Sequence, residues 1–220
     1  MGIQNFGAPR AEITFLQSNH SIDFFIETGT FRGETTQWAA SRFKKVITIE
    51  GSIEIHRETS SNLKGISNIE FLCGDSRTKL PEALTRIGSH QNALFWLDAH
   101  WMPGSFGETA ECPLLEEIEL ILEHGNGHII LIDDARLFLA PPPLPHKAGD
   151  WPTIDQVMEL LHRKGNHGRY SVVFHDVIFS VPQSLRTSIE PYFQRLVTDE
   201  MNSVEPLPLS KKILKKLLGR

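Results

Sequence analysis

Cysteine and long apolar runs are scarce in this sequence, and each scarcity excludes a class of protein. Its 220 residues contain two cysteines, Cys73 and Cys112, which are too few and too unpatterned for a disulfide framework or a zinc site. No apolar run approaches the length of a membrane-spanning helix, and the first residues lack the charged and then apolar pattern of a signal peptide. We therefore expect a cytoplasmic protein in a reducing environment.

Basic residues are also scarce outside the last eleven positions. The net charge is −5, and residues 210–220 contribute five positive charges and no negative one, so the other 209 residues carry −10 (−5 minus +5). Such a body does not favour a nucleic acid as partner, because a phosphate backbone rewards a basic surface. Residues 210–220 form a basic amphipathic segment, for which docking on the acidic body, docking on a partner subunit and weak contact with an anionic membrane are the alternatives.

From residue 22 onward, apolar runs alternate with amphipathic segments. Continuous apolar strands separated by helices indicate a parallel sheet that is buried on both faces. Two further runs, 170–174 and 177–181, predict a closing hairpin. We therefore expect one doubly wound, Rossmann-like α/β sheet of seven strands, mostly parallel with an antiparallel last strand. The other expected strands are 22–27, 45–50, 68–72, 93–98 and 128–133, and the helices are about 34–42, 53–63, 77–87, 112–124 and 153–163.

Composition divides the chain into an N-terminal arm or helix at 1–21, the α/β domain at 22–182 and a C-terminal extension at 183–220. Two long loops interrupt the domain: 101–111 follows the fourth strand, and the proline-rich 135–152 follows the fifth. Loops at the carboxyl ends of parallel strands border the ligand crevice of such sheets. Both loops are candidate walls of a site, although surface decoration would have the same sequence pattern.

The stretch 22–34, IDFFIETGTFRGE, has the pattern of a strand, a glycine turn and a helix start. The strand stops at Glu27, and the turn contains Gly29 and Gly33, which permit close backbone approach or positive φ. A unit of this kind presents backbone N–H groups and a helix N-terminus to a polar ligand. One glycine would be ordinary in such a turn, whereas two glycines near acidic strand ends favour a ligand site.

Acidic residues also end the second strand and follow the third. Glu50 lies about 20 residues after the glycine turn, where a carboxylate can accept hydrogen bonds from ribose hydroxyls. Alternatively, it only neighbours the cap of the helix that begins near Ser52. Asp75 and Ser76 are placed to contact a base edge, but Asp75 could equally cap the helix that follows it.

This ordered set of motifs resembles the class I S-adenosylmethionine-dependent methyltransferases over roughly residues 20–182. The spacing E-x-G-x-x-x-G differs from the G-x-G-x-x-G of nicotinamide dehydrogenases. The resemblance implies S-adenosylmethionine as the cofactor, with its amino-acid end at the first turn, its ribose at the second strand and its adenine after the third. The residues implied in these contacts are Glu27, Thr28, Gly29, Gly33, Glu50, Gly51, Asp75 and Ser76.

Three more acids follow two further strands: Asp98 ends the fourth, and Asp133 and Asp134 end the fifth. If these strands are neighbours, their ends lie ~5 Å apart, within range of shared coordination to a hard cation such as Mg²⁺. The pattern is similar to the metal-dependent O-methyltransferases of the catechol and macrocin types. That likeness implies methylation of a small-molecule or sugar hydroxyl with help from a divalent cation. Carboxylates that only cap the following helices are the alternative.

His100 and Asp98 are the candidate catalytic residues. The catechol pattern is Asp-His-Trp-Lys with the lysine as base, whereas this chain has Asp98-Ala99-His100-Trp101-Met102 and no lysine. His100 can accept a proton because its unperturbed pKa is near 6.5, or it can be a metal ligand or only a wall of the site. Arg136 is expected to pair with Asp134, and a clamp on an anionic substrate group is the alternative. The remaining histidines, including His124, His128, His162 and His167, are expected to be solvated.

Three other functions fit parts of the pattern. They are a nicotinamide-dependent oxidoreductase, a metal-dependent glycosyltransferase and a non-catalytic nucleotide-binding protein on a Rossmann-like fold. The expected partner is a small molecule with a hydroxyl group, and a homo-oligomer is compatible with the sequence.

Overall fold

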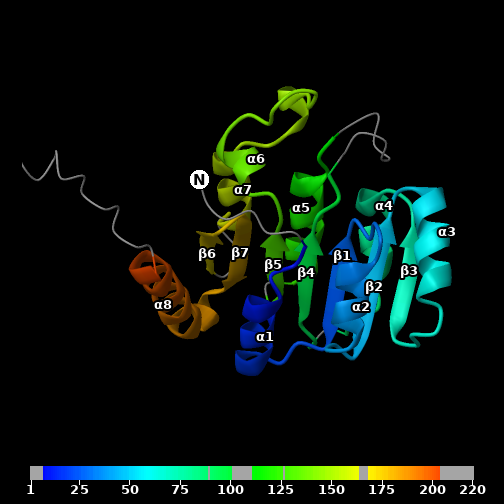
Figure 1. Ribbon diagram of the computed structural model, residues 1–220, viewed down its shortest axis with the longest axis horizontal. Coiled ribbons are helices and arrows are strands. Elements are labelled where there is room, and N and C mark those ends of the chain that lie inside the picture. Colours follow the sequence, from blue (N-terminus) through cyan, green and yellow to red (C-terminus); the bar gives the residue numbers. More distant parts are fainter. Residues whose placement is uncertain (1–6, 89, 101–110, 126, 164–167, 204–220) are drawn as a thin grey trace, which may run out of the picture. The chain divides into compact units, whose positions relative to one another are not determined.

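The computed structural model describes residues 7–88, 90–100, 111–125, 127–163 and 168–203. The chain divides into two compact units, residues 1–186 and residues 187–220. The first unit contains a seven-stranded sheet with the strand order β3-β2-β1-β4-β5-β7-β6 (Figure 1). The strands are β1 (Phe24–Thr28), β2 (Lys45–Glu50), β3 (Ile69–Cys73), β4 (Ala93–Leu97), β5 (Ile129–Ile132), β6 (Arg169–Phe174) and β7 (Val177–Pro182).

The pairing of the strands confirms the predicted doubly wound sheet. Strands β1 to β5 pair in parallel, and β7 pairs antiparallel with both β5 and β6. In the register of β1, Thr28 lies opposite Ile49 on one side and Leu97 on the other, and Leu97 lies opposite Ile132. The carboxyl ends of β1, β2, β4 and β5 therefore meet at one edge of the sheet, as a ligand crevice of this class requires.

The helices fall where the sequence predicts them, with ends that differ by a few residues. Local caps explain several starts: the Ser52 side chain accepts from the Ile55 N–H before α3, and Thr153 and Gln156 form a capping box at α7. The short helix α6 was not predicted. The helices of the first unit are α1 (Arg10–Asn19), α2 (Glu34–Ala40), α3 (Ile53–Asn62), α4 (Ser76–Leu84), α5 (Leu114–His124), α6 (Arg136–Leu139) and α7 (Ile154–Leu161), with 3-10 turns η1 (Ala148–Asp150) and η2 (Gln183–Leu185).

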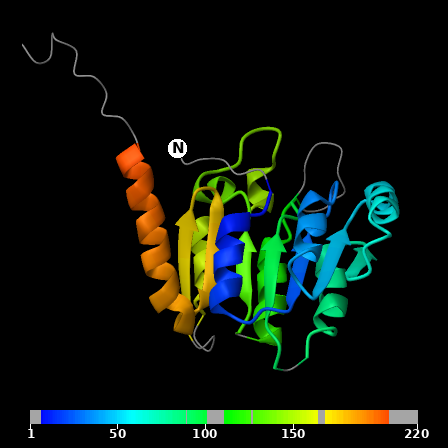
Figure 2. The same cartoon turned by 60° about the horizontal axis from the view of Figure 1, so that its bottom comes forward.

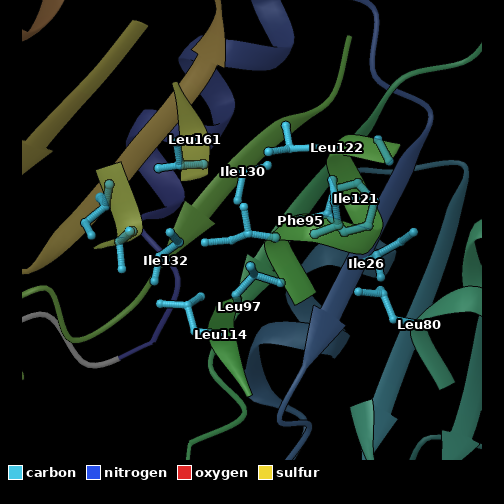
Figure 3. Close-up of a cluster of buried hydrophobic side chains, with 14 of the residues drawn as sticks. Ile26, Leu80, Phe95, Leu97, Leu114, Ile121, Leu122, Ile130, Ile132 and Leu161 are labelled. Carbon is cyan, nitrogen blue, oxygen red and sulfur yellow. The ribbon is translucent and has the colours of Figure 1, made fainter. Parts of the chain in front are cut away.

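The hydrophobic core lies between the central strands and the helices that cover them. Figure 2 shows α1 and α2 on the face of the sheet that is turned forward. On the other face, side chains of β1, β4 and β5 point toward α4, α5 and α7 (Figure 3). Ile26, Phe95 and Ile130 in these strands are fully buried, and burying a side chain of this size stabilises the fold by roughly 1.5–3 kcal/mol. The central strands are buried on both faces, which is why they read as continuous apolar runs.

His128 corrects one expectation, because it is 2% exposed rather than solvated. Its Nδ1 accepts the Ala93 N–H at 3.1 Å, and its Nε2 lies 2.9 Å from Nδ1 of His124. Burial, and then the charges of His124 and Arg169, lower the pKa of His128 to about 4. His128 immediately precedes β5 and bonds the first residue of β4, so it lies at the opposite edge of the sheet from the crevice.

The second unit contains the helix α8 (Arg186–Ser203), which the sequence analysis did not predict. The basic segment 210–220 lies outside the described residues, so its docking or membrane contact stays a prediction. None of the described helices combines the length and apolar character that crossing a membrane requires.

Candidate functional site

Left-handed backbone marks three turns of the first unit. Among the described residues other than glycine, positive φ occurs at Phe31 (46°), Asp134 (56°) and His175 (52°). Phe31 lies in the turn after β1, Asp134 follows β5, and His175 lies in the turn between β6 and β7. Such conformations cost about 1–3 kcal/mol each and concentrate where a site demands a fixed geometry.

The turn after β1 needs both of its glycines. Gly29 has a φ of 87°, and a Cβ there would lie 2.4 Å from the carbonyl oxygen of Asp98. Gly33 has a φ of 74°, and a Cβ there would lie 2.7 Å from Cγ2 of Thr59. The Gly29 N–H also donates to the Ile49 carbonyl at 2.9 Å. The turn therefore draws the ends of β1, β2 and β4 together, in the close approach that the two glycines predict.

Glu27 lies beneath this turn and is fully buried. Its Oε2 accepts hydrogen bonds from Thr36 Oγ1 at 2.5 Å and from Thr48 Oγ1 at 2.8 Å, which tie β1 to α2 and β2. Burial raises the pKa of Glu27 to about 7, against the effect of the two hydroxyl groups. Glu27 thus fixes the start of the turn, and its contact with a cofactor stays a prediction.

Glu50 ends β2 beside the same turn. Its Oε2 accepts the Phe31 N–H at 2.9 Å, and its Oε1 accepts the Ser52 N–H at 2.8 Å. The carboxylate therefore joins the first turn to the start of α3, so the cap-neighbour role is present. Each oxygen of an ionised carboxylate has about two acceptor positions, so one on each oxygen remains for a ribose hydroxyl. The two roles considered for Glu50 are compatible.

Asp75, by contrast, is engaged by its own helix. Its Oδ1 accepts the Arg77 N–H at 2.9 Å as the N-cap of α4, and its Oδ2 lies 2.5 Å from Nη2 of Arg77. The hydrogen bonds from Arg77 hold the pKa of Asp75 below its usual value. The capping alternative is therefore present, and adenine contact by Asp75 and Ser76 stays a prediction.

His100 lies between two strand-end carboxylates. Its Nε2 is 2.8 Å from Oδ2 of Asp134, and its Nδ1 is 3.5 Å from Oδ1 of Asp98. Burial, and then the charges of Asp133 and Asp134, raise the pKa of Asp98 well above its usual value. Burial and the charge of Asp134 also raise the pKa of Asp133 to about 7. The predicted convergence of the three aspartates at neighbouring strand ends is therefore present.

Arg136 forms the ion pair that was predicted and a second one that was not. Its Nη1 lies 2.5 Å from Oδ1 of Asp134 and also bonds Oδ2 of Asp176. Although burial acts to raise it, the pKa of Asp134 lies below its usual value because His100 and Arg136 bond the carboxylate. Asp176 further accepts the Arg136 N–H at 2.9 Å, so the β6–β7 turn braces the residues after β5. The sequence analysis did not identify Asp176. The feature that could have indicated it is a single acidic residue in the turn of the predicted hairpin.

The donor set around His100 does not have the arrangement of a metal centre. In the part of the chain that the structure describes, no group of three or more His, Cys, Asp and Glu side chains could hold a metal ion. Asp134 is shared by His100 and Arg136, and Oδ1 of Asp133 accepts the Asp134 N–H at 2.8 Å. The divalent cation therefore stays a prediction.

Trp151 forms an aromatic wall beside His100. Its ring centroid lies 5.4 Å from that of His100, and its side chain is 5% exposed. Glu111 holds this wall in place, because its Oε2 accepts Trp151 Nε1 at 2.8 Å and the Lys147 N–H at 3.1 Å, and lies 3.2 Å from Nδ1 of His146. The end of the proline-rich loop thus lies beside His100, and its role as a wall of the site stays a prediction. Most of the other loop lies outside the described residues.

Glu117 is a buried acid that the sequence analysis did not single out. It is 1% exposed, in the first turn of α5, and burial raises its pKa to about 7 while the hydroxyls of Ser76 and Thr28 act to lower it. The helical period places it on the same face as the buried Leu114 and Ile121. An acid at an apolar position of the period was the signal that could have identified it.

No protein-family model matches the sequence, and neither does any curated protein. Solved structures do match. A putative caffeoyl-CoA O-methyltransferase from Staphylococcus aureus gives a TM-score of 0.57 at 11% identity, over 82% of this chain and 86% of that one. A methyltransferase from Podospora anserina with bound S-adenosylhomocysteine (SAH) gives 0.57 at 15% identity, over 81% and 80%. A putative O-methyltransferase from Klebsiella pneumoniae gives 0.54 at 15% identity, over 82% and 83%.

At these identities the likeness establishes the fold alone. The chain has the fold of the class I S-adenosylmethionine-dependent methyltransferases, which confirms at the level of the fold the family that the sequence resembles.

Proposed function

We propose that this protein is an S-adenosylmethionine-dependent methyltransferase that methylates a hydroxyl group of a small molecule or sugar. The observation that carries the proposal is the position of His100, between Asp98 and Asp134 at adjacent strand ends. The backbone of Asp98 is also the one that Gly29 approaches. The turn proposed for the cofactor and the cluster proposed for the acceptor are therefore contiguous, as methyl transfer requires.

The residues of the first three turns fit the cofactor. At Gly29 and Gly33 a side chain would clash with neighbouring atoms, so both positions of the turn require glycine. Glu50 has acceptor positions left for ribose hydroxyls. In this proposal Thr28, Gly51, Asp75 and Ser76 complete the binding surface. S-Adenosylmethionine, when bound, supplies a methyl group on a positively charged sulfur. The chain itself has to orient the acceptor and remove its proton.

His100 is the residue that takes that proton in the proposed mechanism. With Nε2 donating to Asp134, Nδ1, which faces Oδ1 of Asp98 at 3.5 Å, is the nitrogen that accepts a proton from the acceptor hydroxyl. Asp134 then stabilises the imidazolium that forms, and Arg136 keeps Asp134 in place. Trp151 packs on the imidazole and limits the access of water, which strengthens these electrostatic interactions.

A divalent cation held by Asp98, Asp133 and Asp134 is the alternative form of this proposal. It would lower the pKa of the acceptor hydroxyl and fix its position. The described side chains do not favour it, because Asp134 is already engaged by His100 and Arg136. We therefore derive no step through a cation. The low basic charge of the body supports a small-molecule acceptor rather than a nucleic acid.

Ligand binding tests the class of function directly. A ligand at 100 times its dissociation constant (Kd) stabilises the folded state by about 2.7 kcal/mol, which a thermal shift detects. We expect a shift with SAH and none with NAD, and the reverse result would favour the nicotinamide oxidoreductase. Release of SAH from S-adenosylmethionine in the presence of phenol and sugar acceptors then tests O-methylation. His100→Gln should abolish that release while the Kd for SAH stays within about twofold.

A further inference from the structure

Glu117, in the first turn of α5, lies near the end of β1 and the start of α4. Its carboxyl is close enough to the hydroxyls of Thr28 and Ser76 for both to influence it, and its charge acts on Asp98 at the end of β4. Thr28 ends the strand that leads into the glycine turn, and Ser76 begins α4. The carboxyl of Glu117 therefore lies close to strand ends that border the proposed cofactor crevice, on the α4–α5 side of the sheet.

One oxygen of this carboxyl has no hydrogen-bond partner. Among the buried side-chain atoms of the described residues, only Oε1 of Glu117 and Nε2 of His56 lack one. A buried acceptor without a partner destabilises a fold, more so when the group is charged. An apolar residue would fit the helical period better, since Leu114, Ile118 and Ile121 form the rest of this buried face. An acid at this position lowers the stability of the free protein, and a bound ligand that donates a hydrogen bond can offset that loss.

The chemical groups that could donate a hydrogen bond to Oε1 of Glu117 are few. An acceptor oxygen needs an N–H or O–H donor, and the donors of S-adenosylmethionine are its ribose hydroxyls, its ammonium group and the amino group of its adenine. Glu50 stands at the strand proposed for the ribose. Asp75, which follows β3, accepts two hydrogen bonds from Arg77 on each of its oxygens and so has no acceptor position left. Glu117 is thus the acceptor on that side left for a nitrogen donor.

We propose that Glu117 is a cofactor-binding residue whose carboxyl accepts a hydrogen bond from an amino group of S-adenosylmethionine. This inference rests on the proposed function and adds to it a residue outside the three strand-end turns. If the carboxyl serves ligand binding and not packing, replacing it should raise the stability of the free protein and lower its affinity for the cofactor, which is a trade of stability for affinity. Its raised pKa is in keeping with this trade, because the ionised group is disfavoured in the free protein.

The test compares Glu117→Gln with Glu116→Gln, its exposed neighbour on the same helix, which lies 3.9 Å from Arg77. Titration calorimetry with SAH at pH 8 should show a Kd raised about tenfold or more in Glu117→Gln, because a hydrogen bond to a charged group is lost. Glu116→Gln should stay within about twofold of the wild type. The melting temperature of ligand-free Glu117→Gln should equal or exceed that of the wild type. Glu117→Met, with a side chain of similar length and no polar group, covers the case in which the amide does not fold.

A second ligand identifies the amino group. 5′-Methylthioadenosine keeps the adenine and the ribose but lacks the amino-acid end. If Glu117→Gln weakens its binding by the same factor as that of SAH, the donor lies in the adenosine part, and because Glu50 stands at the strand proposed for the ribose, it is the adenine amino group. If only SAH binding is weakened, the donor is the ammonium group, and either result supports the proposal.

Two results would overturn it, and they are distinguishable. Wild-type affinity for SAH in a folded Glu117→Gln or Glu117→Met removes Glu117 from the cofactor site and leaves the methyltransferase proposal standing. A wild-type protein that does not bind SAH at all overturns both proposals together.

Discussion

Acid should remove the contribution that the neutral side chain of His128 makes to the stability of this protein. Burial lowers the pKa of His128 from an ordinary 6.5 to about 4 in the folded chain. Between these values the unfolded chain binds a proton that the folded chain excludes, so stability is retained above pH 6.5 and lost as the pH falls toward 4. At 1.36 kcal/mol per unit, the contribution lost between pH 7.5 and pH 4.5 is about 2–3 kcal/mol.

Four acids act in the opposite direction, so a comparison of variants is needed. The pKa values of Glu27, Glu117 and Asp133 are raised to about 7 and that of Asp98 is raised as well, and these carboxyls stabilise the fold when they become protonated as the pH falls. His128→Asn can keep an oxygen where Nδ1 accepts the Ala93 N–H, and it removes the titrating group. His90→Asn, at an exposed histidine, is the matched control.

Urea unfolding from pH 4.5 to 7.5 provides the assay for all three proteins. The stability of the wild type relative to His128→Asn should fall by about 2–3 kcal/mol over this range, whereas the difference from His90→Asn should stay nearly constant. If the stability of the wild type changes with pH in parallel with that of His128→Asn, the assignment of a depressed pKa to His128 is refuted. His128 would then be charged in the folded protein, in spite of Arg169 and His124 beside it.

Three further outcomes test the site. Gly29→Ala should cost about 2–5 kcal/mol of stability and remove SAH binding, because its Cβ would lie 2.4 Å from the Asp98 carbonyl oxygen at a φ of 87°; unchanged denaturation and binding would show that the turn adapts. Trp151→Phe, which loses the hydrogen bond to Glu111, should lower kcat at an unchanged Kd for SAH. An unchanged kcat would show that Trp151 only packs against its neighbours. Turnover should persist in EDTA, and its loss with rescue by Mg²⁺ would establish the cation.

The fold was predictable because its signals are local and repeated. Five continuous apolar runs separated by helical periods leave few arrangements other than a parallel sheet, and the observed order places their carboxyl ends together. Gly29 was predictable as well, since the turn requires it. The acids that follow the strands were found for the same reason: their positions in the sequence determine the edge at which they lie.

Residues whose role depends on a partner far along the chain were missed. Glu111 bonds Trp151 forty positions later, and Asp176 bonds Arg136 forty positions earlier. No periodicity relates such pairs, because packing of the loops brings them together. His128 was misjudged for a related reason. A histidine before a strand is usually solvated, whereas β4, His124 and Arg169 surround this one.

The distribution of charge at the crevice favours one cofactor class over its rival. Asp133 and Glu117 are buried and Asp98 is half-buried, and the pKa values of all three acids are raised, so none of them has enough positive charge nearby to offset its desolvation. Arg136, the cation at this cluster among the described side chains, is divided between Asp134 and Asp176. A ligand with a positive sulfur favours the ionised form of these acids and is attracted to it, whereas the pyrophosphate of a dinucleotide is repelled by it. The acids that lower the stability of the free protein thus support S-adenosylmethionine over NAD, and raising the salt concentration should weaken that discrimination only slightly, because buried charges are poorly screened.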